Sequence, residues 1–375
     1  GGNDLQALLD DEPLRGTLPA DPASPALIAF TSGTTSNPKG VVLTHANLLG
    51  EKDGPFAVVP VDEHDVILGV LPLFHALAQM ANLLLPFSAG AHVVFLEALN
   101  TRELLRALQD QGITIFVCVP QFFYLIHQRV TGEIARQGAI ARTTFRALLK
   151  INNAARTMGL NVGPWLFARV HSTLGPRIRL LVTGGSKFDE AIGRDLYALG
   201  LTVLQAYGLT ETSGAATITR PGEPIHTVGQ PFRGVEITVA GLEPGAAAEG
   251  GAPDGEVLIR GPIVMAGYWD PPDATAAVLR DGWLHTGDLG RLDDRGRLTI
   301  TGRLKEVIVL SSGKNIYPEE IETHYRQSIF IRELCVIGAA PPGQPSAERL
   351  HAIVVPDLDE MGGRQIVNTV ELIRF

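Results

Sequence analysis

Short apolar segments alternate with longer helical patterns over the first half of this chain, and this alternation constrains its fold most strongly. The apolar segments fit buried strands at residues 26–30, 66–70, 91–95, 114–119, 178–182 and 202–206. Strands that alternate with helices form βαβ units, in which neighbouring strands run parallel. The sequence therefore predicts an α/β fold with layered, mainly parallel sheets and helices.

The second half of the chain has a different pattern. Glycine, proline and short alternating strands dominate after about residue 228, as in VEITVAG, GEVLIRG and RGRLTITG, which indicates a small antiparallel β unit. From residue 304 a strand (VIVL), a helix (PEEIETHYRQ) and a strand (CVIGAA) follow, and VELIRF begins a further helix. We therefore expect a large α/β domain at 1–227, a β-rich subdomain at 228–303 and an α+β domain at 304–375.

The composition excludes several classes of protein. The 375 residues include 31 Lys and Arg against 40 Asp and Glu, a net charge of −9, whereas nucleic-acid binders usually have a basic surplus. The two cysteines, Cys118 and Cys335, are far apart and lack metal-spaced partners, which argues against a disulfide framework or a zinc site. These features favour a reducing, cytoplasmic compartment.

One stretch, residues 69–96, is apolar enough to resemble a membrane span. Six polar or helix-breaking residues interrupt it, and a spanning segment would leave them in hydrocarbon at a cost of several kcal/mol. We interpret it as a buried helix followed by a buried strand, so no transmembrane segment is expected, and peripheral contact with a membrane is left open. A long helical stretch at 124–174 has no catalytic pattern, and we interpret it as packing or a lid.

The segment TSGTTSNPKG, residues 31–40, follows the first strand directly and has the chemistry of a phosphate cradle. Gly33 and its small neighbours let backbone N–H groups turn toward an anion, and Lys39 adds positive charge. Hydroxyl groups that can donate hydrogen bonds come from Thr31, Ser32, Thr34 and Thr35. The alternative is an ordinary polar turn, because the glycine–lysine order differs from that of the Walker motif.

A second candidate loop is QAYGLTETSG, residues 205–214. The end of a strand delivers an aromatic ring (Tyr207), a hydroxyl (Thr210) and a carboxylate (Glu211), and ligands in open α/β sheets sit at such strand ends. Mg²⁺ could join Glu211 to a phosphate group. Taken alone, Glu211 could equally be a solvated turn residue.

A third candidate lies within residues 281–303. Asp288, in a Thr-Gly-Asp turn, could accept hydrogen bonds from a ribose diol, and Arg303 could reach the same sugar or a phosphate. A solvated acid in a hairpin turn is the alternative. The order and combination of the three loops carry more information than any one of them.

Together these motifs resemble those of the adenylate-forming superfamily, which includes acyl-CoA synthetases, luciferases and peptide-synthetase adenylation domains. The run DGWLHTGDLGRLDDRG and the helical stretch at 124–174 are most similar to bacterial long-chain fatty-acid–CoA ligases. TSGTTSNPKG resembles the phosphate loop of the family, with Ser36 where a glycine is usual. PLFHALA resembles a motif that places Phe74 and His75 near the acyl group and the adenylate.

The resemblance assigns roles to further residues. It implies that Tyr207 lies against adenine, Thr210 near phosphate and Glu211 on Mg²⁺. Asp288 and Arg303 would bind the ribose, and Lys305 would be the hinge of the C-terminal domain. The remaining nucleotide-binding positions are Gly184, Gly185 and Ser186 in VTGGSKF, and Gln205, Ala206 and Gly208 in QAYG. The catalytic set implied is Lys39, His75 and Glu211, with Lys305 as the hinge.

The implied reaction uses ATP, Mg²⁺ and coenzyme A, with a long-chain fatty acid as substrate. The acid would form an acyl-adenylate, and the thiol of coenzyme A would then displace AMP. Two alternatives stay open: transfer to an acyl carrier protein, and a catalytically silent nucleotide- or acyl-binding relative, which Ser36 favours. Compared with the family pattern, we expect the chain to lack an opening subdomain and the C-terminal catalytic lysine.

Overall fold

The computed structural model describes residues 20–31, 38–96, 101–241, 254–269, 272–309, 315–325, 328, 330–339, 349–358 and 361. Its largest sheet has seven strands in the order β4-β3-β5-β6-β7-β8-β9. Strands β4 to β7 pair in parallel, and β8 and β9 pair antiparallel. The strands are β3 (Val66–Gly69), β4 (His92–Phe95), β5 (Ile115–Cys118), β6 (Leu180–Thr183), β7 (Val203–Tyr207), β8 (Thr217–Ile218) and β9 (Gln230–Pro231). The predicted α/β fold with a mainly parallel sheet is confirmed.

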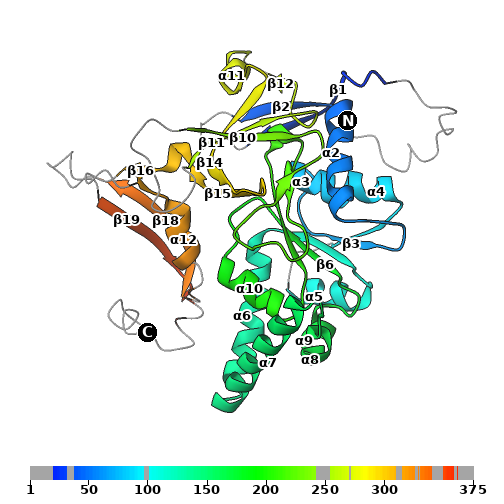
Figure 1. The fold of residues 1–375 in the computed structure, drawn as a ribbon, viewed down its shortest axis with the longest axis vertical. Helices are drawn as coiled ribbons and strands as arrows, with labels where there is room; N and C mark the ends of the chain where they lie inside the picture. Colours follow the sequence, from blue (N-terminus) through cyan, green and yellow to red (C-terminus); the bar gives the residue numbers. More distant parts are fainter. Residues whose placement is uncertain are drawn as a thin grey trace.

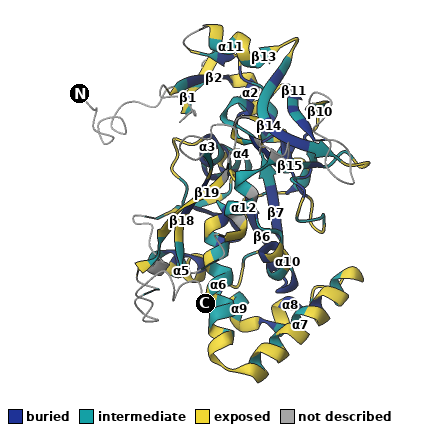
Figure 2. Cartoon of the chain, turned by 90° about the vertical axis from the view of Figure 1, so that its left-hand side faces the viewer, coloured by how far each residue is buried: buried dark blue, intermediate teal, exposed yellow. Residues whose placement is uncertain are grey.

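Both faces of this sheet are buried, which explains the continuous apolar runs in the sequence. Successive side chains enter different cores, because side chains alternate across a strand. Ile67 and Ile115 belong to one core, and their neighbours Leu68 and Phe116 belong to the other. Figure 2 shows the buried strands β6 and β7 in the middle of the molecule.

Helices cover the sheet and extend beyond it. The predicted helical stretch at 124–174 is confirmed as a series of helices, of which α6 and α7 project from the body of the protein (Figure 1). Their bounds, with those of the neighbouring helices, are α5 (Thr101–Asp110), α6 (Pro120–Arg136), α7 (Ala139–Thr157), α8 (Gly163–Leu166), α9 (Ala168–Leu174) and α10 (Glu190–Ala198).

The apolar stretch at 69–96 forms a helix followed by a strand, as predicted, but it is less buried than expected. The helix consists of α3 (Ala76–Gln79), the π-helical turn η1 (Met80–Leu84) and α4 (Leu85–Ala89). Phe87 is 69% exposed, and β4 exposes His92 and Phe95 because it is the edge strand of the sheet. Among the described residues, no helix combines the length and the apolar character needed to cross a bilayer.

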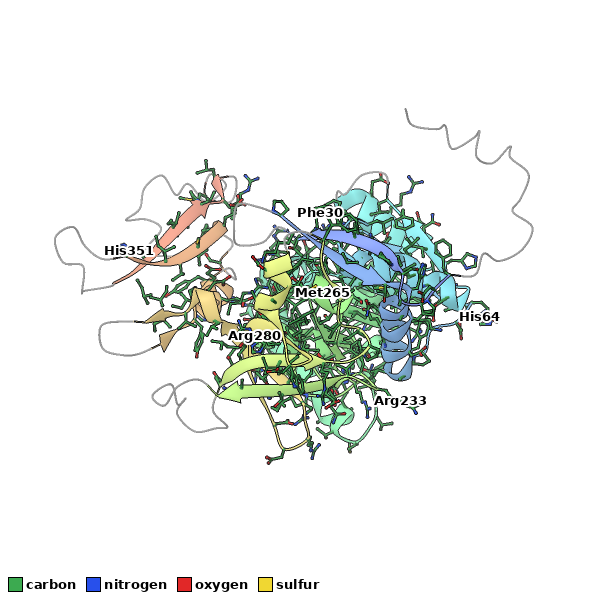
Figure 3. All side chains as sticks on the ribbon, turned by 90° about the horizontal axis from the view of Figure 1, so that it is seen from above. Phe30, His64, Arg233, Met265, Arg280 and His351 are labelled. Atoms are coloured by element: carbon green, nitrogen blue, oxygen red, sulfur yellow. The ribbon has the colours of Figure 1, made fainter. Side chains whose placement is uncertain are left out.

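A separate three-stranded sheet contains the two strands that flank the candidate phosphate loop. It has the order β1 (Pro25–Thr31), β2 (Lys39–Thr44) and β12 (Gly267–Tyr268), all antiparallel. The prediction of a buried strand at 26–30 was wrong about burial: β1 is an edge strand, and Phe30 is exposed (Figure 3).

Helix α2 (His45–Val58) follows β2, and Thr44 caps its N-terminus. The Thr44 hydroxyl accepts a hydrogen bond from the backbone N–H of Asn47, and the Asn47 side chain accepts one from the backbone N–H of Thr44. This reciprocal capping box satisfies helix donors that would otherwise lack partners. The Asn47 amide also donates to the carbonyls of Pro262 and Val264, which fixes α2 against a distant loop.

The predicted antiparallel β unit forms a five-stranded sheet. Strands β10, β11, β14 and β13 are neighbours in that order, and β15 pairs with β14. Their bounds are β10 (Glu236–Gly241), β11 (Gly255–Arg260), β13 (Leu279–Arg280), β14 (Trp283–Leu292) and β15 (Leu298–Arg303), with α11 (Pro272–Val278) before β13. Strands β14 and β15 of this sheet thus contain Asp288 and Arg303, the residues of the third candidate motif.

The last described region has the predicted order of strand, helix and strand. Its elements are η3 (Leu304–Glu306), β16 (Ile308–Val309), β17 (Asn315–Ile316), α12 (Pro318–Tyr325), β18 (Ile331–Ala339) and β19 (Arg349–Pro356). A small core of its own contains Ile308, Leu334 and Val336. The β18–β19 hairpin lies to one side of the protein (Figures 1 and 3). The helix predicted from residue 370 lies outside the described residues.

Candidate active site

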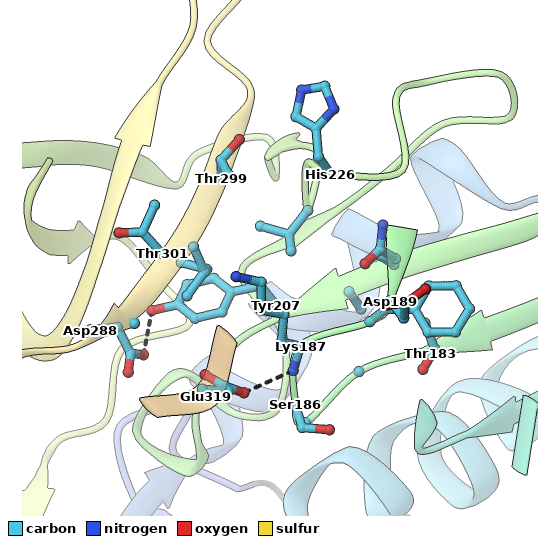
Figure 4. A pocket seen from close by; sticks show the side chains of 18 of the residues that line it. Thr183, Ser186, Lys187, Asp189, Tyr207, His226, Asp288, Thr299, Thr301 and Glu319 are labelled. Carbon is cyan, nitrogen blue, oxygen red and sulfur yellow. Dashed lines mark hydrogen bonds between the residues drawn. The ribbon is translucent and has the colours of Figure 1, made fainter. Parts of the chain in front are cut away.

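A cleft of about 450 Å³ opens at the carboxyl ends of β6 and β7 and is closed on its other sides by β15 and α12 (Figure 4). It brings together three motifs that are far apart in the sequence. The expected nucleotide-binding residues that line it are Gly184, Gly185, Ser186, Gln205, Ala206, Tyr207, Gly208, Asp288 and Arg303. The edge of the sheet where the strand order predicts a ligand is therefore hollow.

Tyr207, Asp288 and Arg303 form a hydrogen-bonded network in this cleft. The Tyr207 hydroxyl donates to Asp288 Oδ2 at 2.8 Å, and Arg303 Nε lies 3.1 Å from Asp288 Oδ1. Burial raises the pKa of Asp288, while the Arg303 guanidinium and the Tyr207 hydroxyl act in the opposite direction. Burial, followed by the Asp288 carboxylate, holds the pKa of Tyr207 well above its usual value, so the phenol remains a donor.

Two buried hydroxyl groups in the cleft, those of Thr183 and Thr301, have no hydrogen-bond partner among the described residues. Buried polar groups normally have partners, so these hydroxyls are suited to a polar ligand. Gly184 approaches Ala206 closely, because a Cβ there would lie only 2.9 Å from the Ala206 carbonyl oxygen. An aromatic ring, a buried carboxylate and unpartnered hydroxyls around one cleft fit a nucleotide.

Gln205 lines the cleft, but its amide group is engaged with the backbone. Its Nε2 donates to the carbonyls of Ile225 and Thr227, the latter at 3.1 Å. This side chain therefore holds the loop at 225–227 against β7.

The carboxylate expected to bind Mg²⁺ lies outside the cleft lining, together with the expected lysine. Glu211 Oε1 accepts a hydrogen bond from the Tyr268 hydroxyl at 2.7 Å. Lys39 Nζ lies 4.8 Å from the centre of the Tyr268 ring, within the range of a cation–π contact. Burial first, and then the Glu211 carboxylate, raise the pKa of Tyr268. Tyr268 joins the two residues, and the sequence analysis did not select it.

Glu211 offers one carboxylate, whose Oε1 accepts a hydrogen bond from the Tyr268 hydroxyl. Among the residues that the structure describes, no group of three or more His, Cys, Asp or Glu side chains could hold a metal ion. Mg²⁺ typically uses one or two carboxylates together with substrate phosphates, so a single carboxylate fits this metal.

Of the remaining expected site residues, some are described but lie outside the cleft lining, and others are not described. Thr31 pairs with Lys39 across β1 and β2, the two strands that flank the candidate phosphate loop. Thr210 begins the short helix η2 (Thr210–Thr212), and His75 directly precedes α3 with its ring 4.5 Å from that of Phe74. None of these residues is among those lining the cleft. Ser32, Gly33, Thr34, Thr35 and Ser36 lie outside the described residues.

The C-terminal region reaches the cleft as well. Glu319 of α12 lines it, and Glu319 Oε1 accepts a hydrogen bond from the Lys187 backbone at 3.1 Å (Figure 4). Lys305, the expected hinge residue, lies in η3 directly after β15. Glu319 was missed by the sequence analysis because a lone helix glutamate has no pattern to distinguish it.

A second, apolar pocket of about 80 Å³ lies behind β6 and β7, between α2 and the helix at 76–89. Leu77, Met80 and Val182 line it, and Ala206 lines both this pocket and the cleft. Its one carboxylate is that of Glu51, whose Oε1 accepts a hydrogen bond from the Ala215 backbone at 2.9 Å. Within the described part of the chain Glu51 Oε2 is buried without a partner, and burial raises the pKa of Glu51 well above its ordinary value.

Comparisons with known proteins show the family of the chain. The family model described as "AMP-binding enzyme" matches residues 3–269, so the chain belongs to the AMP-binding enzymes of the adenylate-forming superfamily. The long-chain-fatty-acid–CoA ligase FadD15 of Mycobacterium tuberculosis is 33% identical over 338 residues, which cover 85% of this chain and 53% of that protein. Human long-chain-fatty-acid–CoA ligase 1 is 33% identical over 363 residues, covering 92% and 49%.

The chain is also similar to a ligase named for a different acid and to proteins of known structure. Indoleacetate–CoA ligase of Aromatoleum aromaticum is 33% identical over 344 residues, covering 89% of this chain and 58% of that protein. The Bacillus subtilis O-succinylbenzoate–CoA synthetase bound to AMP matches with a TM-score of 0.69 and 26% identity, covering 95% of this chain and 64% of that chain. The chain spans about half the length of the curated relatives it matches.

Proposed function

We propose that this chain provides the nucleotide-binding part of an AMP-forming acid–thiol ligase that acts on a long-chain fatty acid. The observation that carries the proposal is the network of Tyr207, Asp288 and Arg303 in a cleft with unpartnered hydroxyls. The similarity to long-chain-fatty-acid–CoA ligases supports the choice of acid. We further propose that the protein acts in the cytoplasm.

In this proposal the cleft binds ATP. Tyr207 would pack against the base, and Asp288 would accept hydrogen bonds from the ribose hydroxyls while Arg303 holds its carboxylate in place. Lys39 and the loop that follows Thr31 would neutralise the phosphates. Glu211 would hold Mg²⁺, which supplies further positive charge at the phosphates when bound. These groups contribute by positioning and charge stabilisation, which phosphoryl chemistry requires.

Two displacement steps follow from this arrangement. A carboxylate oxygen of the acid attacks the α-phosphorus of ATP, and the bond to pyrophosphate breaks as the acyl-adenylate forms. The thiolate sulfur of coenzyme A then attacks the acyl carbon, and AMP leaves with the electron pair of the broken C–O bond. We propose domain boundaries at 227/228 and 303/304, with Lys305 as the hinge. The C-terminal region would then rotate about Lys305 between the two steps.

The acyl group would enter the apolar pocket, which shares Ala206 with the cleft. This pocket, about 80 Å³, is smaller than the roughly 300 Å³ at which ordinary small-molecule sites begin. The similarity to indoleacetate–CoA ligase supports a compact aryl acid as a second candidate substrate.

The test is ATP–pyrophosphate exchange with palmitate, with indoleacetate and without acid. Exchange that depends on palmitate supports the main proposal, and exchange that depends on indoleacetate alone supports the second candidate. Direct binding of AMP to the chain separates a ligase from a protein that binds acids only. Product formation with coenzyme A or with an acyl carrier protein then identifies the thiol acceptor. Absence of both exchange and AMP binding would contradict the proposal.

A further inference from the structure

Charge is distributed unevenly along this acidic chain. The segment at 124–174, which includes most of α6 and all of α7, has seven Lys and Arg residues against a single glutamate. The rest of the chain has 24 Lys and Arg against 39 Asp and Glu. Figure 1 shows α6 and α7 projecting from the body of the protein, and Figure 2 shows that α7 is mostly exposed. The positive charge is thus concentrated on a projecting pair of helices.

Packing against the body determines which face of α7 points outward. Phe145 packs against Phe167 with ring centres 5.5 Å apart, and Asn152 is buried, its amide donating to the Ala198 carbonyl at 2.9 Å. Arg156 also faces inward, because it lies 3.5 Å above the Tyr197 ring. The outward face of α7 is therefore opposite these residues.

That outward face has two parallel stripes of different chemistry. Arg142, Arg146 and Lys150 are exposed and spaced four residues apart, so they lie on one side of the helix. Ile140 and Met158 are 85% and 72% exposed, and with Ile151 they are separated by 11 and 7 residues. These separations correspond to about three and two helical turns, so the apolar residues also share one side. At 3.6 residues per turn this side lies roughly 130° around the helix from the basic stripe, so the two stripes border the outward face from opposite sides.

An exposed tryptophan lies in the helix after α7, and few acids lie near the basic stripe. Trp165 in α8, which packs against α7, is 80% exposed. The acids described on this part of the surface are already engaged: Glu133 pairs with Arg136 at 2.9 Å, and Asp195 pairs with His127 at 2.9 Å. The basic stripe of α7 thus has no acid partner among the described residues.

We propose that the outward face of α7, together with Trp165, docks on the surface of an anionic lipid bilayer. A helix with a basic stripe and an apolar one lies in the membrane interface, where lysines and arginines contact lipid phosphates and apolar side chains enter the acyl boundary. Tryptophan favours the same interface. A single-stranded nucleic acid would match the charge, but it is bound by stacking aromatic rings and gains nothing from exposed isoleucines.

The acidic remainder of the chain supports this choice of partner. An anionic membrane repels the body of the protein and attracts the projecting helices, so the charge asymmetry fixes one orientation of docking. This inference does not depend on the proposed ligase activity.

The test measures binding of the chain to vesicles of phosphatidylcholine alone or mixed with phosphatidylglycerol, by co-sedimentation. We expect binding to the mixed vesicles that weakens with salt. The triple variant Arg142→Ala, Arg146→Ala, Lys150→Ala should bind on the order of 100-fold more weakly, since each basic residue contributes about fivefold. A matched control, Arg220→Ala, Arg233→Ala, Arg295→Ala, removes the same charge from other exposed sites and should bind like wild type.

Two further measurements identify the contact. Vesicles should shift the tryptophan emission to shorter wavelength, and Trp165→Phe should abolish this shift, whereas Trp269→Phe should retain it. Ile140→Gln with Ile151→Gln should weaken vesicle binding by about tenfold. Circular dichroism and Tm report whether each variant folds. If the triple variant does not fold, Trp165→Phe and the control variant still test the proposal.

Three outcomes would overturn the proposal. The first is equal binding to both kinds of vesicle, and the second is equal loss of binding in the triple variant and its control. The third is tighter binding to a single-stranded oligonucleotide at the same salt concentration, unaffected by the isoleucine substitutions, which would make the surface a nucleic-acid site.

Discussion

Asp288 and Arg303 are cross-strand partners in β14 and β15, and the Arg303 guanidinium nitrogen Nε lies 3.1 Å from the Asp288 carboxylate. The carboxylate is almost fully buried, whereas the arginine is about half exposed. The hairpin therefore holds an acid inside the cleft and supplies its countercharge from the rim. Loss of either partner should therefore weaken the binding of a ligand in the cleft.

Asp288→Asn should weaken binding of AMP by about 10- to 100-fold, because it removes a charged acceptor whose hydrogen bonds contribute roughly 1.5–3 kcal/mol. Isothermal titration of the chain with AMP measures this directly. Asp293→Asn is the matched control, since Asp293 lies in the turn of the same hairpin and is exposed. An AMP affinity unchanged in Asp288→Asn would remove this residue from the nucleotide site.

Glu211→Gln should lower the affinity for ATP in the presence of Mg²⁺ by at least about tenfold, the scale of weakening a metal site. The substitution keeps the shape and leaves an oxygen to accept from Tyr268, so the fold should persist. With a chelator present, wild type and variant should bind ATP equally. Glu63→Gln, at an exposed residue, provides the control. A loss that is the same with and without the chelator would show that Glu211 does not act through a metal.

Lys305→Pro tests the proposed hinge in an active ligase. Proline fixes φ near −65° and removes the N–H, so it should hold one orientation of the C-terminal region. If that orientation is the adenylating one, acyl-AMP should still form in a single turnover but should not be consumed when coenzyme A is added. Lys305→Ala changes the side chain and leaves the backbone free, so both steps should continue. Normal consumption of acyl-AMP by the proline variant would contradict the hinge.

Glu51→Gln should increase the free energy of unfolding above pH 7, by more than about 1 kcal/mol. Burial raises the pKa of Glu51 above its ordinary value of 4.5, so in this pH range the folded protein binds a proton that the unfolded chain releases. Wild-type stability should therefore fall as the pH rises from about 4.5 toward the folded-state pKa, and the variant should lack that decline. Urea unfolding from pH 4 to pH 8 measures it.

Glu63→Gln is the control for this comparison, because Glu63 is exposed. It should leave the pH dependence of wild type in place. Parallel unfolding curves of wild type and Glu51→Gln at every pH would mean that Glu51 is ionised in the folded protein.

The parallel strands and the cleft residues could be predicted from the sequence, and the contacts between motifs could not. Strands such as β5 are buried on both faces, so they appear as uninterrupted apolar runs. Asp288 and Arg303 were found through their resemblance to known motifs. Tyr268 has no such motif: it meets Glu211, 57 positions away, only because β12 pairs with β2. A contact of this kind depends on tertiary pairing, which local sequence patterns do not contain.

Burial was the other quantity that the sequence could not determine. The strand at 26–30 is as apolar as the central strands, yet it lies at the edge of its sheet and exposes Phe30. Glu51 shows the reverse, a carboxylate on a helix that the fold encloses completely. Edge position and enclosure follow from how whole sheets and helices assemble, so a segment read alone cannot distinguish them.

Ala206 separates the two pockets by the thickness of a single residue of β7. A larger side chain at this position would enter the apolar pocket, because Ala206 lies on the same face of β7 as Leu204, in the core on that side. In the proposed ligase, residue 206 would therefore limit the size of the acid. Leu77 and Met80 face the apolar pocket alone. Divergence toward new acids in this lineage would therefore proceed through the helix at 76–89, while the strand between the pockets stays small.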